Sequence, residues 1–198
     1  MLKSLRDAYF TPERLARFKR EYEITASLNP GVESPIDGVI CALSMEDLQN
    51  EHYIVTEDFG GSSLDLYDAK GSWHLADFFK LAFQVIDALG EVHQRQIIHK
   101  DINPSNIVYN SMTGQAKIID FGLSTRLPRE TLTRIVPTGM DGTMAYISPE
   151  QTGRMNRVVD HRSDFYSLGI TFYELLTGKL PFEEKETLSL LHSHLAKQ

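Results

Sequence analysis

The sequence is poor in cysteine, with the single residue Cys41 among 198. A lone cysteine cannot form a disulfide within the chain, which excludes a disulfide-stabilised secreted scaffold and agrees with a reducing compartment. No apolar run approaches the roughly 20 residues of a membrane-spanning helix, and residues 1–20 lack the apolar core of a signal peptide. We therefore expect a soluble cytoplasmic chain with no membrane span.

An excess of positive charge is missing as well. The formal net charge is −7 at pH 7, which argues against a nucleic-acid partner. The basic stretch at 14–21 has acidic neighbours on a helical pattern, so we interpret it as the solvated face of a helix. With 41% hydrophobic residues the chain can form a core, and its length suits one domain or part of a larger one.

Local patterns predict three main helices. The first covers residues 11–28, with Thr11 as the N-cap and Pro12 at the first helical position. The second, at 75–94, has apolar residues at helical spacing and is amphipathic to buried. The third, at 163–178, is apolar on nearly every side, so we expect it to be buried all round.

Strands are predicted at 38–45 and 52–59, and a hairpin closed by Thr113 and Gly114 follows residue 106. The small and polar residues 60–63 are interpreted as a linker between two parts of the chain. A long irregular segment at 123–151 has the length of a functional or disordered loop. The predicted organisation is a small part with one helix and a few strands, followed by a mainly helical part.

Two polar motifs stand close together just after the second predicted helix. They are "HKDINPSNIVYN" at 99–110 and "KIIDFG" at 117–122. Asp, Asn, Pro and Ser are common turn residues, so the first motif has an alternative interpretation as a solvated turn. Asp120 by itself would be an ordinary acid at the end of a strand. The two motifs in this order favour a phosphate-transferring protein.

The ordered motifs resemble those of the protein kinase family. "HKD…N" resembles the catalytic loop, "DFG" the metal-binding loop, and "SPE" at 148–150 the end of the activation segment. "SDFYSLG" at 163–169 is similar to the central helix of the large lobe. "MLKSL" at 1–5 resembles the strand that carries the phosphate-binding lysine, and Glu21 falls where the family's helix glutamate pairs with that lysine.

This resemblance covers the whole chain and implies a two-lobed α+β fold. Residues 1–59 would form the small lobe and the hinge, and residues 60–198 the large lobe. The sequence of residues 142–182 is similar to that of the N-terminal kinase modules of very large bacterial and fungal signalling proteins. In those proteins an ATPase-type domain and often a histidine-kinase end follow, so other domains of a longer polypeptide are expected partners.

The resemblance implies a role for each matching polar residue, because phosphoryl transfer depends on positioning and charge cancellation. Asp101 would accept or orient the proton of the substrate hydroxyl. Asn106 and Asp120 would bind Mg²⁺, which prefers oxygen ligands. Lys3 would hold the phosphates of ATP, and Glu21 would orient Lys3.

The same resemblance places the adenine-binding hinge at Thr56, Glu57, Asp58 and Phe59. Thr56 would be the gatekeeper, and backbone groups of the segment would meet adenine. The lysine and glutamate assignments have plain alternatives: Lys3 could be a solvated terminal residue, and Glu21 a helix-surface acid paired with Arg17 or Arg14.

The remaining polar residues of the motifs are expected to be structural. His99 is expected to pack in the core, and His93, His161, His192 and His194 show no metal-ligand pattern. In the family, Asp164 braces the backbone of the catalytic loop.

Departures from the family pattern are informative. Lys100 stands where most regulated kinases have arginine, and lysine lacks the planar bidentate fork for phosphate. Asn103 stands where a lysine usually contacts the transferred phosphate, so one positive charge is missing. Met1 takes the place of a small residue above adenine, and Glu150 is expected to lack its usual arginine partner.

Some of the family's segments have no counterpart in the sequence. No GxGxxG occurs in the chain, and only two residues precede Lys3. We therefore expect a small lobe without its first two strands and a large lobe without its last helices, with little phosphotransfer by this chain alone.

Three functions remain in view at this point. The first is ATP-dependent phosphorylation of protein serine and threonine in signal transduction. The second is a pseudokinase or regulatory nucleotide-binding module, or an inactive fragment of a larger kinase, which Asn103 favours. The third is a small-molecule phosphotransferase of kinase-like fold, which the "SPE" element and the long segment before it disfavour.

Overall fold

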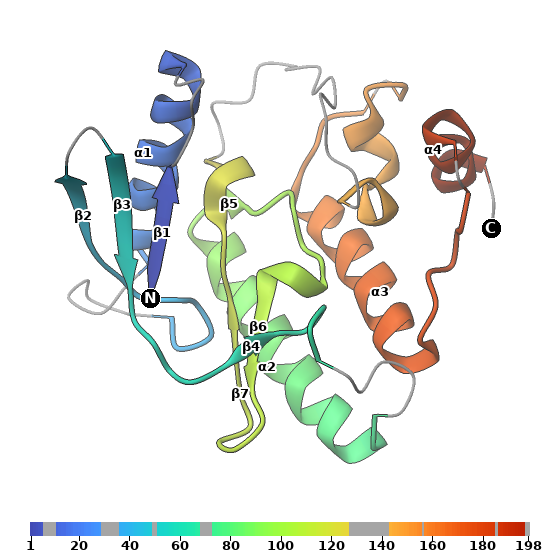
Figure 1. The fold of residues 1–198 in the computed structure, drawn as a ribbon. Coiled ribbons are helices and arrows are strands. Elements are labelled where there is room, and N and C mark those ends of the chain that lie inside the picture. The colour runs from blue at the N-terminus through green and yellow to red at the C-terminus, as the bar shows by residue number, and fades with distance from the viewer. Residues whose placement is uncertain are drawn as a thin grey trace.

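The first part of the chain forms a three-stranded antiparallel sheet with one helix beside it, as Figure 1 shows. The computed structural model describes residues 1–5, 11–28, 36–48, 51–67, 73–126, 143–155, 157–184 and 186–196. The strand order is β1-β3-β2, so β3 is central. The elements are β1 (Leu2–Leu5), α1 (Pro12–Ala26), β2 (Ala42–Leu48) and β3 (Glu51–Thr56).

Helix α1 begins where the sequence predicts. The Thr11 hydroxyl accepts a hydrogen bond from the Arg14 backbone N–H at 3.3 Å, and Pro12 follows as the first helical residue. Phe18 is buried and packs with Ala42 and Ile54 in a small core between helix and sheet. The helix ends at Ala26 rather than at residue 28. The Asn-Pro-Gly stop at 29–31 lies outside the described residues.

Residues 38–41 are not part of the strand that the apolar run predicts, because β2 begins at Ala42. Val39 instead forms a parallel bridge with Ile118 of the second part of the chain. The Ile118 N–H donates to the Gly38 carbonyl at 2.8 Å. A Cβ on Gly38 would lie 2.4 Å from the Ala88 Cβ, so only glycine permits this approach. The apolar run is divided between two sheets by a tertiary contact.

The predicted linker at 60–63 is partly wrong. Ser62–Ser63 form strand β4, which pairs with β6 in the register Ser62↔Tyr109 and Ser63↔Val108. Small polar residues carry no strand signal, but their backbone groups find hydrogen-bonding partners along the edge of β6. The position of the boundary between the two lobes stays a prediction.

The second part of the chain is mainly helical, with short strands (Figure 1). Helix α2 has the predicted bounds, and the predicted hairpin is present, with Gly114 at a φ of 73° in its turn. The long irregular segment is described only at its two ends. The elements are α2 (Leu75–Gln94), β5 (Ile97–Ile98), β6 (Ile107–Asn110), β7 (Gln115–Ile118), β8 (Thr125–Arg126), α3 (His161–Thr177), α4 (Thr187–Ala196) and the 3₁₀ turns η1 (Pro104–Asn106), η2 (Phe121–Leu123), η3 (Thr143–Tyr146) and η4 (Pro149–Thr152).

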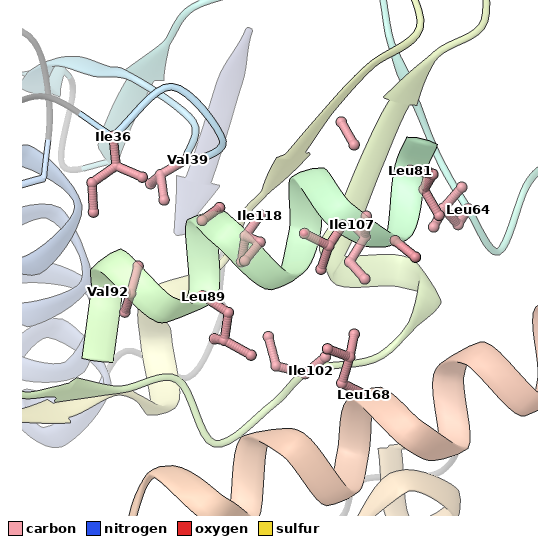
Figure 2. Packing of buried hydrophobic residues seen from close by; sticks show 14 of the residues in the cluster. Ile36, Val39, Leu64, Leu81, Leu89, Val92, Ile102, Ile107, Ile118 and Leu168 are labelled. Atoms are coloured by element: carbon pink, nitrogen blue, oxygen red, sulfur yellow. The ribbon is translucent and has the colours of Figure 1, made fainter. Parts of the chain in front are cut away.

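The main core surrounds α2. Figure 2 shows Ile36 and Val39 near one end of this helix, Leu64 and Leu81 near the other, and Leu168 of α3 beside Ile102. Segments from both parts of the chain therefore meet in one apolar cluster. Replacing a buried leucine of such a cluster with alanine lowers the free energy of unfolding by about 2–5 kcal/mol. This packing makes α2 a rigid support for the polar motifs that follow it.

Helix α3 has the predicted stop, because Gly178 ends it with a φ of 73°. The expectation that it is buried all round is wrong: Phe165, Tyr173 and Leu176 are 45%, 47% and 38% exposed. The described neighbours α2, β5, η3 and η4 leave these three side chains partly exposed. Among the described residues, no helix has both the length and the apolar character needed to span a bilayer.

Candidate active site

Lys3 connects three segments that are far apart in the sequence. Its Nζ lies 2.6 Å from Oε1 of Glu21 on α1 and 2.9 Å from Oδ2 of Asp120, just after β7. Strand β1 holds Lys3 opposite Ile54, and the Glu21 residue is only 8% exposed. Glu21 is thus paired with Lys3, as predicted, and Arg17 donates instead to the Gly122 carbonyl at 2.9 Å.

The charges in this group are unbalanced. Burial disfavours the charged forms, but the two carboxylates raise the pKa of Lys3, and Lys3 together with the Gly122 N–H lowers the pKa of Asp120. Burial and repulsion from Asp120 raise the pKa of Glu21 in spite of Lys3. Two carboxylates share one ammonium, so the site can accommodate a further cation next to Asp120.

The Asp-Phe-Gly turn has a shape that depends on its sequence. Asp120 has a φ of 62° and accepts a hydrogen bond from the Gly122 N–H at 3.1 Å. A Cβ on Gly122 would lie 3.0 Å from Oδ1 of Asp120 and 3.1 Å from Oε2 of Glu21. Phe121 is fully buried against the His99 ring, with 4.7 Å between the ring centroids. The turn therefore holds the Asp120 carboxylate beside Lys3.

Asp101 is held by two asparagine side chains. Asn106 Nδ2 donates to Asp101 Oδ2 at 3.0 Å and to its carbonyl at 2.8 Å, and Asn103 Nδ2 donates to Asp101 Oδ1 at 3.0 Å. Because the side-chain nitrogen of Asn106 is used in these hydrogen bonds, its side-chain oxygen Oδ1 is the atom able to bind a metal. Burial, with a contribution from Asp120, raises the pKa of Asp101.

Asn103 does not reach outward as a phosphate-binding lysine would. It is 3% exposed, and its Oδ1 accepts a hydrogen bond from the Ser105 N–H at 2.9 Å. Both ends of its amide are therefore used inside the loop, where it orients Asp101.

Asp164 supports the backbone of the loop that contains Asp101. This fully buried residue accepts hydrogen bonds from the backbone N–H groups of His99 at 2.8 Å and Lys100 at 2.7 Å. His93 Nε2 lies 2.8 Å from the same carboxylate. The structural role expected for His93 thus has a definite partner, which no sequence pattern indicated.

His99 is fully buried, and its ring joins two backbone groups. Its Nε2 lies 3.0 Å from the Ile119 carbonyl, and its Nδ1 accepts a hydrogen bond from the Asp101 N–H at 3.3 Å. A carbonyl can only accept, so the ring carries a proton on Nε2. His99 therefore packs in the core, as expected, and helps to fix the backbone of Asp101.

The segment predicted to be the hinge is linked to β7. The Glu57 carboxylate accepts hydrogen bonds from Lys117 Nζ at 2.5 Å and from the Cys41 N–H at 2.8 Å. Lys117 Nζ also lies 5.3 Å from the centroid of the Phe59 ring. Thr56 pairs through its backbone with Met1, with 2.9 Å between the Thr56 nitrogen and the Met1 oxygen. The link between Glu57 and Lys117 was not predicted, because 60 residues separate the partners.

Glu150, expected to lack its usual arginine partner, has a serine as a partner in the structure. The Ser163 hydroxyl at the start of α3 donates to Glu150 Oε1 at 2.5 Å. This role of Ser163 could not be predicted from the sequence, because serine is common near the start of helices whether or not it binds a distant carboxylate.

Lys3 lies between two acids, the Asp-Phe-Gly turn is left-handed at Asp120, and Asp101 is held by the asparagine five residues later. This arrangement is typical of the protein kinase fold. The chain belongs to the protein kinase family: the family model "Protein kinase domain" matches residues 2–198.

Its relatives carry serine/threonine-kinase names. The chain is 36% identical over 185 residues to the serine/threonine-protein kinase PrkC of Bacillus subtilis. The aligned region covers 92% of this chain and 27% of that protein. It is 34% identical over 186 residues to the serine/threonine-protein kinase PknB of Mycobacterium leprae, covering 93% and 29%. The chain thus spans little more than a quarter of the length of these relatives.

Replacing Lys3 with methionine should weaken the binding of Mg²⁺-ATP at least tenfold, because a charged hydrogen bond to phosphate contributes about 1.5–3 kcal/mol. The free energy of unfolding should fall by about 1–3 kcal/mol, because the variant leaves the buried Glu21 carboxylate without its ion-pair partner. Calorimetric titration and urea denaturation measure the two quantities. Lys80→Met, which removes an exposed partner of Asp77, is the matched control, and parental affinity in Lys3→Met would refute the role of Lys3.

Proposed function

We propose that this chain is the catalytic domain of a protein kinase that phosphorylates serine and threonine hydroxyls in signal transduction, with ATP and Mg²⁺. The observation that carries the proposal is the position of Lys3 between Glu21 and Asp120, with Asp101 and Asn106 joined in the adjacent loop. The names of the relatives support the choice of serine and threonine.

In this proposal each residue has one task. Lys3 binds a phosphate oxygen of ATP, and Glu21 keeps the ammonium in position. Asp120 and the side-chain oxygen of Asn106 would bind Mg²⁺. The metal ion would neutralise part of the negative charge on the phosphates. No group of three or more His, Cys, Asp or Glu in the described parts of the chain could hold a metal alone, so phosphate and water oxygens would complete the coordination.

Asp101 receives the proton of the attacking hydroxyl. The oxygen of serine or threonine forms a bond to the γ-phosphorus, the bond from that phosphorus to the β–γ bridging oxygen breaks, and ADP leaves. The amides of Asn103 and Asn106 keep the carboxylate oriented, which is the positioning that this reaction requires.

The backbone of Glu57 and Phe59 would contact adenine. The Glu57 N–H already donates to the Cys41 carbonyl at 2.9 Å. Within the described residues, the Glu57 carbonyl and the Phe59 N–H make no hydrogen bond with another backbone group. These two groups form an acceptor–donor pair of the kind that the edge of adenine can use. The Thr56 side chain would line the back of the same site.

We place the protein in the cytoplasm, where ATP and Mg²⁺ are supplied, and expect further domains of a longer polypeptide among its partners. The share of the relatives' length that the chain spans supports the second expectation.

Asp101→Asn tests the proposal directly. Phosphotransfer should fall about 10²–10⁴-fold, the usual contribution of a general base. The assay follows labelled γ-phosphate onto a generic serine/threonine protein, with this chain and with a longer chain that adds the residues encoded on either side. Asp87→Asn on the exposed face of α2 is the control.

A regulatory nucleotide-binding module is the second candidate, which the inward-facing Asn103 favours. It would bind Mg²⁺-ATP with a rise in melting temperature, yet neither length of chain would transfer phosphate. Transfer that is unaffected by Asp101→Asn would refute the assigned role of Asp101.

A further inference from the structure

Gln151 is a buried side chain that no motif assigns to the catalytic loop. It lies in η4, directly after the Ser-Pro-Glu element, and is 6% exposed. Its Nε2 donates to the Lys100 carbonyl at 2.8 Å. Its Oε1 accepts hydrogen bonds from the Ser148 N–H at 3.1 Å and from the Ser148 hydroxyl at 2.8 Å. The amide therefore connects two segments that lie 51 residues apart in the sequence.

The partners determine which end of the amide points to which segment. A backbone carbonyl only accepts and a backbone N–H only donates. The nitrogen of Gln151 must therefore face Lys100, and its oxygen must face Ser148. A glutamate at this position would place an acceptor against the Lys100 carbonyl.

Lys100 is a residue whose backbone needs support. Its φ of 69° is unfavourable for a residue with a side chain, at a cost of about 1–3 kcal/mol unless the surroundings impose it. Asp164 holds its N–H at 2.7 Å, and Gln151 holds its carbonyl. The next N–H, that of Asp101, donates to His99 Nδ1 at 3.3 Å. The peptide group between Lys100 and Asp101 is thus bound at its oxygen and at its nitrogen.

We propose that Gln151 is a positioning residue for Asp101: by binding the Lys100 carbonyl it fixes the peptide from which the Asp101 side chain projects, and it couples the Ser-Pro-Glu turn to the catalytic loop. The positioning effect on catalysis rests on the proposed kinase function. The coupling between the two segments does not, so it can be measured without activity.

Three variants separate this role from general stability. Gln151→Glu keeps the shape but loses the donor, and Gln151→Met removes the donor without adding a charge. Gln84→Glu is the control, because Gln84 also bridges backbone groups: its Nε2 donates to the Gly114 carbonyl at 2.8 Å and its Oε1 accepts from the Ala116 N–H at 3.1 Å. Gln84 lies outside the candidate site.

Amide hydrogen exchange is the readout that does not depend on activity. In Gln151→Glu and Gln151→Met the amides of Lys100 and Asp101 should exchange about tenfold faster than in the parent, as expected for one lost buried hydrogen bond. The amides inside α2 should keep their parental rates. Gln84→Glu should leave Lys100 and Asp101 unchanged.

The pH dependence of Gln151→Glu distinguishes a lost donor from loose packing. Burial raises the pKa of a carboxyl, so a glutamate here would take up a proton as the pH falls from about 8 to 5 and regain a donor for Lys100. Protection relative to the parent should recover at low pH in Gln151→Glu and not in Gln151→Met. The comparison with the parent corrects for the titratable groups on the surrounding elements, which include His99, the acceptor of the Asp101 N–H, as well as Lys100, Asp101, Glu150, Asp164 and His194.

Phosphotransfer supplies the second readout. Both Gln151 variants should lower kcat about tenfold to a hundredfold, the effect of a small misplacement of a catalytic group, with the KM for ATP unchanged. Unchanged exchange at Lys100 and Asp101 in Gln151→Met would overturn the inference. If exchange is faster in the Gln151 variants but neither this chain nor the longer chain transfers phosphate, the proposed function is refuted and the coupling is supported.

Discussion

Replacing Asp120 with asparagine is expected to abolish the stabilisation of this chain by Mg²⁺-ATP. A ligand at a hundredfold excess over its Kd stabilises the folded state by about 2.7 kcal/mol, which raises the melting temperature of a chain of this size by roughly 5–11 °C. Asparagine keeps the size of the side chain and can still accept from the Gly122 N–H. It loses the charge that attracts the metal, so the shift should disappear in a thermal melt.

Asp77→Asn is the matched control for this experiment. It makes the same chemical change at an exposed residue that is ion-paired with Lys80 on α2, and it should keep the full shift. Measuring ATP without Mg²⁺ separates the metal from the nucleotide: the parent should then lose most of its shift. A full shift in Asp120→Asn would remove Asp120 from the metal site.

Replacing Asp164 with alanine is expected to destabilise the fold by about 3–5 kcal/mol. The residue is fully buried and accepts hydrogen bonds from two backbone N–H groups and from His93. Alanine leaves these donors buried without an acceptor, and each costs about 1–3 kcal/mol. Urea denaturation of the parent and the variant measures the difference.

Asp164→Asn should cost less, about 2–3 kcal/mol, because its oxygen replaces one acceptor while its NH₂ group opposes a donor. Asp160→Asn is the control on the same helix. Asp160 caps α3 by accepting from the Arg162 N–H at 2.9 Å, and asparagine is as good an N-cap as aspartate, so stability should hardly change. A loss below about 1 kcal/mol in Asp164→Ala would show that the loop does not depend on this brace.

The elements predicted correctly from the sequence are those specified by local chemistry. Helix α2 has apolar residues at the helical period over its whole length, and Thr11 and Gly178 are residues that favour helix ends. The turn at Gly114 needs a positive φ, which glycine adopts without strain. In each case the deciding interaction lies within a few residues along the chain.

The polar motifs of the site were also readable, because phosphoryl transfer needs particular residue types in a particular order. In the structure Asn106 donates to the Asp101 carboxylate and Lys3 meets Glu21, while the roles assigned to these residues stay predictions. That Lys3 also contacts Asp120 follows only from the fold, since three separate segments converge there.

By itself, then, the sequence determined the helices with strong periodicity and the turns that need glycine, and it indicated the candidate polar residues of the site, because these depend on local conformation and side-chain chemistry. The tertiary structure decided where backbone groups without a local signal find partners. Gly38 can run beside β7 because it has no side chain to clash with Ala88. Ser62–Ser63 pair with β6. Glu57 meets Lys117, and Gln151 reaches Lys100. Such contacts join residues distant in the chain, and only the complete packing brings their donors and acceptors within reach.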